Sequence, residues 1–261
     1  MPITYPSICA ITKLKSLEDE IPNPMGIRTG IDENFITVSN DDGTVMDDGK
    51  GFGGAQSWLD PEIGDHACGI VAAVNTYLYI TGQTTITKSQ YIKLCEQFRK
   101  EHPVDNFLIE KEIFGAIPSS MGDYIEDRCR EQGLSIKTSW NWYKGSDQYD
   151  TMKKMLANNI PVILGLHSQE AYKTNENELK LYKFEKENFE HKKDVGSHYV
   201  VVTAIYEQEQ AGGSYKRMIE VSSWGEKYYI DYDEYLDFAK TNGINKIINN
   251  IGSNIMEIKI K

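Results

Sequence analysis

The chain has 261 residues, a formal net charge of −11, and 40% hydrophobic and 11% aromatic residues. This length and composition predict a folded protein with one sizeable core or two packed lobes, and they exclude a disordered scaffold. The negative charge argues against partners with anionic surfaces, namely nucleic acids and acidic membranes.

The first fifty residues are rich in turn-forming residues. Segments 40–43 and 47–49 predict loops, with one strand expected at 34–38. We interpret residues 1–50 as an arm that packs on the main body. Prolines interrupt the first residues and no apolar run approaches the length of a membrane span. We therefore expect a soluble, cytoplasmic protein that makes no membrane contact.

A cysteine begins the longest apolar segment of the chain. The turn residues Pro61 and Gly64 stop any helix before Cys68, and segment 70–80 predicts a helix that ends near Gly82. Cys68 is thus expected in the first helical turn. Free backbone N–H groups and the helix dipole favour a thiolate there, which is the nucleophilic form.

Two β-forming runs and a glutamine accompany this cysteine. Segment 196–205 predicts a strand with His198 at its start, where a base would be held rigidly. Segment 219–225 is a second β-forming run that ends in Trp224 and a glycine. Gln56 lies upstream of Cys68, in a glycine-rich segment.

The remaining elements change in character along the chain. The predicted helices lie at 87–102, opened by a Thr87–Gln90 capping box, at 120–132 and at 151–158, and further strands lie at 134–142 and 161–166. Helices come mainly first and strands later, which predicts the α+β class. We expect a helical lobe at about 51–133 and an antiparallel sheet lobe at about 134–261, with a cleft between them.

The order of glutamine, cysteine, histidine and then Ser-Trp-Gly resembles the papain-like cysteine peptidase superfamily. The likeness covers about residues 51–240 and is closest to the bacterial branch that includes the double-glycine leader peptidases. It implies a two-lobed fold in which the Cys68 helix packs on the sheet lobe. It also implies that Cys68 is the nucleophile, His198 its base, and Gln56 the side-chain donor of the oxyanion hole.

One position departs from the family pattern. Ser222 stands where the family has the asparagine that orients the histidine, and a hydroxyl holds a protonated ring less firmly. Glu220, two residues earlier on the same strand face, is the rival third member. Trp224 resembles the family's tryptophan that shields the histidine's hydrogen bond, and ordinary core filling is its other interpretation.

The resemblance implies cysteine-dependent acyl transfer, chiefly peptide or amide hydrolysis of a peptide or protein substrate through a thioacyl intermediate at Cys68, without a cofactor. Motif order does not choose between hydrolysis and transfer to an amine. Two alternatives remain: a papain-like pseudoenzyme that acts as a binding module, and a cell-wall amidase, although those amidases usually carry an export signal or wall anchor. No sequence feature marks the substrate or the oligomeric state.

Other histidines and aromatic residues are placed near the cleft or outside it. We assign Trp58, His66 and Trp224 to the substrate cleft. His66 lies two residues before Cys68, close enough to influence the thiol or line the oxyanion hole. A metal site built from Cys68, His66, His167 and His198 lacks a chelating pair such as His-x-x-x-His, so no metal is expected. His102 and His191 are interpreted as surface residues.

The cysteines and one charged segment complete the predictions. Cys9, Cys68, Cys95 and Cys129 contain no Cys-x-x-Cys pair, which favours a reducing compartment, and Cys95 and Cys129 fit small core residues. Segment 169–194 is rich in Glu, Lys and Asn. A lid or specificity insertion is one interpretation, and a solvated helix or hairpin is the favoured one.

Overall fold

The computed structural model describes most of the chain. The described residues are 25–32, 34–46, 49–64, 66–102, 116–141, 145–168, 176–240 and 252–261. Cys9, the start of the predicted arm and residues 169–175 of the charged segment lie outside them.

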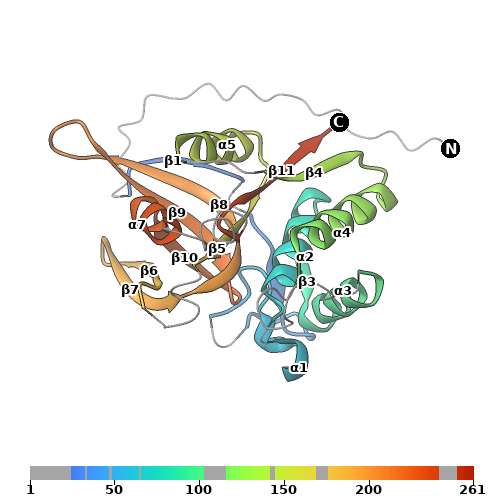
Figure 1. Ribbon diagram of the computed structural model, residues 1–261. Coiled ribbons are helices and arrows are strands. Elements are labelled where there is room, and N and C mark those ends of the chain that lie inside the picture. The colour runs from blue at the N-terminus through green and yellow to red at the C-terminus, as the bar shows by residue number, and fades with distance from the viewer. Residues whose placement is uncertain are drawn as a thin grey trace, which may run out of the picture.

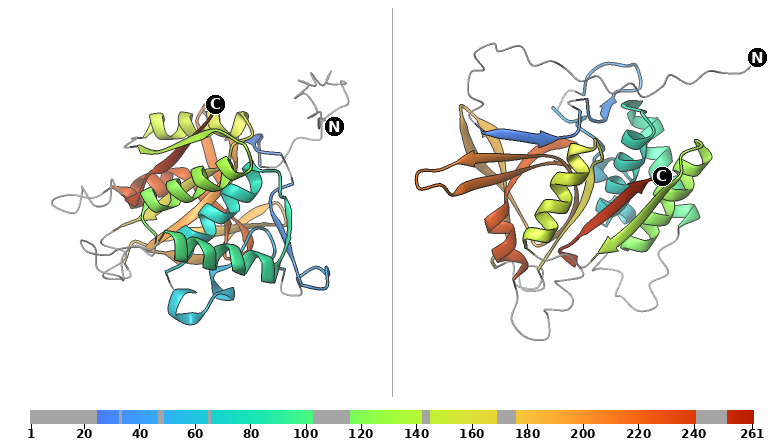
Figure 2. Two further views of the ribbon diagram at one scale, coloured as in Figure 1. Left: turned by 90° about the vertical axis from the view of Figure 1, so that its right-hand side faces the viewer. Right: turned by 90° about the horizontal axis from the view of Figure 1, so that it is seen from above.

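A large antiparallel sheet forms the centre of the molecule (Figure 1). Its order is β4 (Ile136–Asn141), β11 (Ile255–Ile260), β5 (Val162–His167), β8 (Ser197–Glu209), β9 (Tyr215–Ser223), β10 (Glu226–Asp231), β6 (Leu179–Glu185) and β7 (Asn188–Val195). The last strand of the chain, β11, is inserted between β4 and β5 (red arrow in Figure 2).

The described part of the N-terminal arm packs on this body through two short strands. β1 (Ile27–Gly30) pairs with the second half of β8. β2 (Thr37–Ser39) forms a separate parallel pair with β3 (Thr85–Thr87). The strand expected at 34–38 therefore exists, shifted toward the C-terminus.

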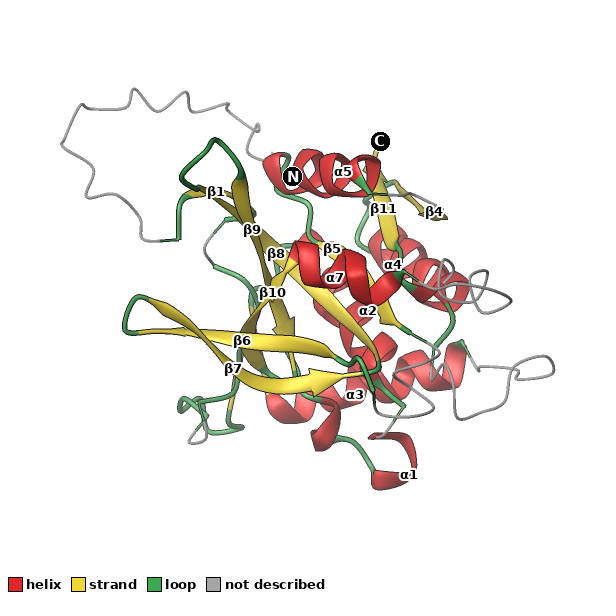
Figure 3. Cartoon of the chain, turned by 60° about the vertical axis from the view of Figure 1, so that its left-hand side comes forward, coloured by secondary structure: helices red, strands yellow, loops and turns green. Residues whose placement is uncertain are grey.

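The helices pack at several places on the sheet. Three of them, α2 (Cys68–Ile80), α3 (Lys88–Glu101) and α4 (Pro118–Glu131), gather on one side of the molecule, opposite the β6–β7 hairpin (Figures 1 and 3). α2 contacts β5 and β8, α5 (Ser146–Ala157) contacts β1, β5, β8 and β11, and α7 (Tyr232–Ala239) contacts β5, β6, β9 and β10. Helices beside an antiparallel sheet give the α+β class that the sequence predicts.

Local sequence explains most element ends. Thr87 and Gln90 form the predicted capping box at the start of α3. α4 begins two residues before the predicted start because Pro118 occupies its first turn, where a missing N–H costs nothing. Within segment 169–194, the described part forms the β6–β7 hairpin, turned by Lys186 and Glu187 at φ of 48° and 65°. The described part is thus a hairpin, as the favoured interpretation expected, and the role of the segment stays a prediction.

Most buried side chains of the helices and the sheet form one large core, and a second, smaller cluster comprises Ala204, Tyr206, Met218 and Tyr229. α2 is buried on nearly every side because its residues are almost all apolar. Cys95 and Cys129 are 1% and 0% exposed, which confirms them as core residues. This core fixes α2, and with it Cys68, against β8. Within the described ranges, no helix is both long and apolar enough to cross a lipid bilayer.

Candidate active site

Cys68 opens α2, as the sequence predicts. The short α1 (Pro61–Gly64) ends just before it, and Ala67 is the N-cap residue without a side-chain cap. Cys68 as a whole residue is half-buried, and its side chain lines the pocket described below. The backbone N–H groups of Tyr199 and Gly69 lower the pKa of the thiol, so both β8 and α2 contribute to its surroundings.

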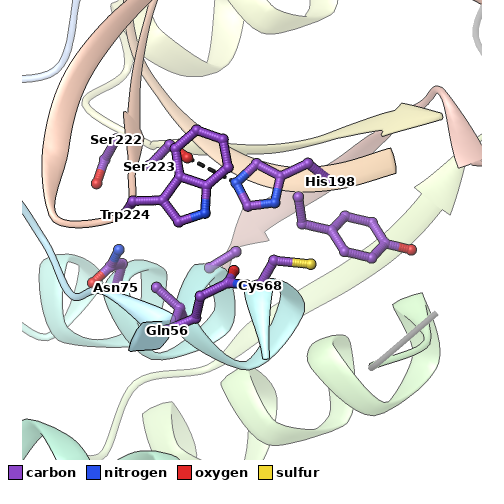
Figure 4. A pocket seen from close by; sticks show the side chains of 10 residues that line it. Gln56, Cys68, Asn75, His198, Ser222, Ser223 and Trp224 are labelled. Atoms are coloured by element: carbon purple, nitrogen blue, oxygen red, sulfur yellow. Dashed lines mark hydrogen bonds between the residues drawn. The ribbon is translucent and has the colours of Figure 1, made fainter. Parts of the chain in front are cut away.

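His198 is the second residue of β8 and lies opposite Leu166 of β5. Its side chain is 8% exposed. Nε2 lies 2.7 Å from Ser223 Oγ on β9. The ring stacks on Trp224, with centroids 4.4 Å apart and an angle of 17° between the planes. In Figure 4 the other ring nitrogen faces the side of the pocket where Cys68 lies.

A tight turn brings Trp224 over this histidine. Trp224 and Gly225 form the two-residue connection between β9 and β10, with φ values of 50° and 78°. Positive φ suits glycine but costs a bulky residue about 1–3 kcal/mol. The turn type demands this conformation, and the stacking on His198 partly compensates for it.

The segment that carries Gln56 is held by a buried asparagine. Gly53 has φ of +75°, and a Cβ atom there would lie 2.6 Å from Ser222 Oγ and 2.7 Å from Asn75 Nδ2. Asn75 Oδ1 accepts hydrogen bonds from Gly54 N (3.1 Å) and Tyr91 Oη (2.8 Å). This close packing fixes the backbone that leads into the short 3₁₀ helix η1 (Gln56–Trp58).

These side chains surround one narrow pocket (Figure 4). Its lining residues are Gln56, Cys68, Val71, Ala72, Asn75, His198, Tyr199, Ser222, Ser223 and Trp224. The cavity volume is about 10 Å³, which is room for about one water molecule. Residues from three distant parts of the chain thus meet at the start of α2.

Neither of the two residues predicted from the sequence to orient His198, Ser222 and Glu220, forms a hydrogen bond with its imidazole. Ser222 lines the pocket, but its Oγ donates to the carbonyl oxygen of Phe52 at 2.7 Å. The histidine's partner is Ser223. The strand register explains the difference, because Ser222 lies opposite Val201, whose side chain points away from the face of His198.

The rival residue Glu220 lies in a different environment. It is 3% exposed and accepts hydrogen bonds from Thr203, Tyr206 and Tyr229. Lys227 Nζ lies 3.1 Å from its Oε2. The prediction that Ser222 or Glu220 orients the imidazole is therefore wrong in this structure.

Trp58 and His66 lie outside the pocket lining. Trp58 packs edge-on against Tyr91 at 6.0 Å, with Lys88 Nζ 5.5 Å from its ring. His66 is exposed in the turn before α2. Their assignment to a wider substrate cleft stays a prediction.

The other histidines lie apart from Cys68. His167 is 1% exposed and its Nδ1 lies 3.0 Å from Ser197 Oγ. His191 is exposed beside Asp194, as expected, whereas His102 is half-buried against Phe98 and Tyr124. The described part of the chain has no cluster of three or more His, Cys, Asp or Glu side chains that would share a metal ion.

Burial is the main cause of the pKa shifts of Cys68 and His198. It raises the pKa of the Cys68 thiol, and the backbone N–H groups of Tyr199 and Gly69 oppose this rise only in part. Burial also lowers the pKa of His198 to about 3, with a smaller contribution from the charge of Lys193. The prediction of a lowered thiol pKa is therefore wrong. A neutral thiol faces the pocket with a neutral imidazole at neutral pH.

Three contributing residues were not identified from the sequence. Ser223 holds the imidazole, Asn75 holds the Gln56 segment, and Lys193 of β7 lies over the Trp224 ring at 4.3 Å. Asn75 had a visible signal, since it is the most polar side chain in the apolar segment 70–80. No sequence feature indicated Lys193, because its position depends on how the β6–β7 hairpin pairs with the rest of the sheet.

Comparisons of the chain with protein-family models, with curated proteins and with solved structures found no match.

Proposed function

We propose that this protein is a papain-like cysteine enzyme that transfers acyl groups, and that it chiefly hydrolyses peptide or amide bonds. One observation carries the proposal: Cys68 at a helix start, His198 on a strand and Gln56 line the same pocket. The hydrogen bond to Ser223 and the stack on Trp224 fix the imidazole, which is what a base requires.

The proposed reaction begins with a neutral pair. The thiol proton of Cys68 passes to His198 as the sulfur attacks the substrate carbonyl carbon, and the oxyanion is stabilised by Gln56 and the Cys68 backbone N–H. His198 then protonates the leaving amine, and the C–N bond breaks to leave a thioester. Water, deprotonated by the same imidazole, then attacks the thioester carbonyl carbon. The C–S bond breaks, the acid is released, and the imidazolium returns the proton to the Cys68 sulfur.

The environment of His198 keeps the imidazole neutral. A pKa of about 3 also makes the resting imidazole a weak base at neutral pH, so in the proposed reaction it takes the thiol proton only together with the attack on the substrate. The Ser223 hydroxyl can accept from Nε2–H, which leaves Nδ1 as the basic nitrogen. Proton transfer and attack are then concerted, because neither buried group is stable as an isolated ion.

The test uses p-nitrophenyl acetate as a generic acyl donor. The wild-type protein should release a burst of p-nitrophenolate and acquire one acetyl group on Cys68, detected by mass spectrometry. Cys68→Ala and His198→Ala should each abolish both signals while circular dichroism stays unchanged. Cys129→Ala, at a buried free cysteine outside the pocket, is the matched control and should behave like wild type. A full burst in either pocket variant would contradict the proposal.

The binding-module alternative also has an observation in its favour. The pocket holds about one water molecule, and burial raises the pKa of the Cys68 thiol. A protein that only binds would show no acetyl group on Cys68 with any activated ester. In such a protein, His198→Ala would also leave the rate at which Cys68 reacts with iodoacetamide unchanged.

A further inference from the structure

Lys193 of β7 lies beside the candidate active site without lining its pocket. Its Nζ is 4.3 Å from the centre of the Trp224 ring, and that ring stacks on His198 with centroids 4.4 Å apart. Nζ therefore lies no farther from the imidazole centre than the sum of these two distances. The charge of Lys193 also acts on His198, whose pKa it helps to lower. A substrate held at the imidazole would thus come close to this lysine.

The pairing of the β6–β7 hairpin directs Lys193 toward this site. Lys193 lies opposite Leu181, and Val195 lies opposite Leu179. Cross-strand partners share a face of the sheet, and these three apolar side chains are buried. The stem of Lys193 therefore follows the face that packs on the body of the molecule. Asp194, the next residue, is exposed and points to the opposite face.

Within the described residues, no carboxylate neutralises the Lys193 ammonium group. Asp194 contacts a histidine of its own strand. Glu226, at the start of β10, lies 3.0 Å from Lys183 Nζ. Lys193 Nζ lies instead beside aromatic rings, with the centre of the Tyr228 ring 5.9 Å away. These rings attract the cation without cancelling its charge, so its N–H groups remain able to bind an anion.

The proposed acyl transfer, on which this inference rests, determines which part of a substrate passes Lys193. The acyl group stays on Cys68, whereas the leaving amine must lie within hydrogen-bond reach of His198. In Figure 4, His198 and Trp224 lie along one side of the pocket, across from Cys68 and Gln56. A leaving group held at the imidazole would run along this side. An extended chain advances about 3.3–3.6 Å per residue, so its first two residues can reach Lys193 Nζ.

We propose that Lys193 binds a carboxylate on the leaving part of the substrate. The carboxylate would belong to an acidic side chain within about two residues of the scissile bond, or to the C-terminus of the substrate. The net charge of −11 repels such a substrate only at long range, because an ionic strength of about 0.15 M screens exposed charges beyond about 8 Å. At contact distance the ammonium group dominates, and its contacts with two rings reduce the side-chain freedom lost on binding.

The experiment compares two esters with the same acetyl group, 4-acetoxybenzoate and the neutral 4-acetoxybenzamide. Their leaving phenols differ in charge at the far end. For each variant, the acetylation rate of Cys68 with the carboxylate is divided by the rate with the amide. This ratio should be about fivefold lower in Lys193→Gln than in wild type, the effect of one exposed charge contact, and Lys193→Arg should retain it. A change in the pKa of His198 affects both esters alike and cancels in the ratio.

The neighbouring lysine supplies the matched control. Lys192→Gln removes an equal charge, but Lys192 pairs with Glu185 and Glu190. Its ratio should equal that of wild type. A wild-type ratio in Lys193→Gln, or an equal loss in Lys192→Gln, would overturn the inference.

A binding measurement separates this inference from the proposed function. The leaving phenol 4-hydroxybenzoate and its neutral amide are titrated into the ¹⁵N-labelled wild-type protein, and the indole resonance of Trp224 is followed. Tighter binding of the carboxylate that is lost in Lys193→Gln would support the Lys193 site, and a simultaneous lack of acetylation would refute the acyl transfer alone. Acetylation of Cys68 with equal binding of both compounds would refute the Lys193 site alone.

Two pairs of dipeptides identify the source of the carboxylate in the same titration. N-acetyl-Ala-Asp-amide against N-acetyl-Ala-Asn-amide tests an acidic side chain, and N-acetyl-Ala-Ala against its amide tests a C-terminal carboxylate. A preference for the charged member that depends on Lys193 supports the inference and names the source. Equal binding within both pairs would overturn it for peptide substrates.

Discussion

The sharpest prediction concerns the serine that holds the imidazole. Ser223→Ala removes a 2.7 Å hydrogen bond to Nε2 of a ring that is 8% exposed. A hydrogen bond to a charged group is worth about 1.5–3 kcal/mol, and in the proposed reaction the ring becomes charged as it takes the Cys68 proton. At 1.36 kcal/mol per factor of ten, the acylation rate of Cys68 should fall about tenfold to 150-fold.

The neighbouring serine supplies the control. Ser222→Ala has the same size change but removes a hydrogen bond to the Phe52 carbonyl, so it should lower the free energy of unfolding by about 1 kcal/mol and the acylation rate only slightly. Ser223→Thr keeps the hydroxyl on a β-branched side chain that suits a strand, and should restore most of the rate. The assay is the p-nitrophenyl acetate burst, with ¹⁵N shifts of His198 to follow its tautomer. Slow acylation of the Ser222→Ala variant, together with wild-type acylation of the Ser223→Ala variant, would refute the register argument.

Two further predictions follow from the pKa shifts of the histidines. Lys193→Gln removes a positive charge that disfavours the imidazolium form of His198, so the pKa of His198 should rise from about 3. The rise should be modest, because Lys193 is exposed and its charge is screened. An NMR titration of His198 measures the shift, and a fall in its pKa would contradict the prediction. Burial lowers the pKa of His167 to about 4. Between pH 6.5 and 4 the unfolded chain therefore binds more protons at this residue than the folded chain does. The free energy of unfolding should fall as the pH drops through that window, by up to about 1.4 kcal/mol per pH unit for this residue. Urea unfolding of His167→Gln should show a weaker pH dependence than wild type across this window, and an equal dependence would refute the assignment.

The sequence was informative wherever local rules decide the outcome. The turn residues before Cys68 and the apolar run after it placed the helix start correctly. The β-forming run around His198 became β8, extended to Glu209. Motif order then predicted which residues meet, and the structure brings Gln56, Cys68, His198 and Trp224 to one pocket.

The same local rules could not predict the pairing register of β8 and β9. β8 contains an irregularity between Val202 and Ala204, where its register with β9 shifts. Which β9 residue faces His198 depends on that register, and one position of slip exchanges Ser222 for Ser223. The alternation of a single strand places Glu220 and Ser222 on one face, but it does not say which face His198 shares. Burial of the thiol likewise depends on distant segments that close over α2.

Burial also bears on how an acyl-transfer reaction would proceed at this pocket. A buried thiolate or a buried imidazolium is each costly alone, which explains why the pKa of Cys68 is raised and that of His198 lowered. Moving the proton from one to the other creates two opposite charges together, and their attraction in a low-dielectric pocket offsets part of both penalties. The net charge of the pair does not change. A shielded pocket therefore suppresses the free thiolate more than it suppresses the coupled proton transfer, so low reactivity of Cys68 toward iodoacetamide is compatible with acyl transfer. Loss of the acetyl adduct in His198→Ala separates enzyme from binding module better than thiol reactivity does.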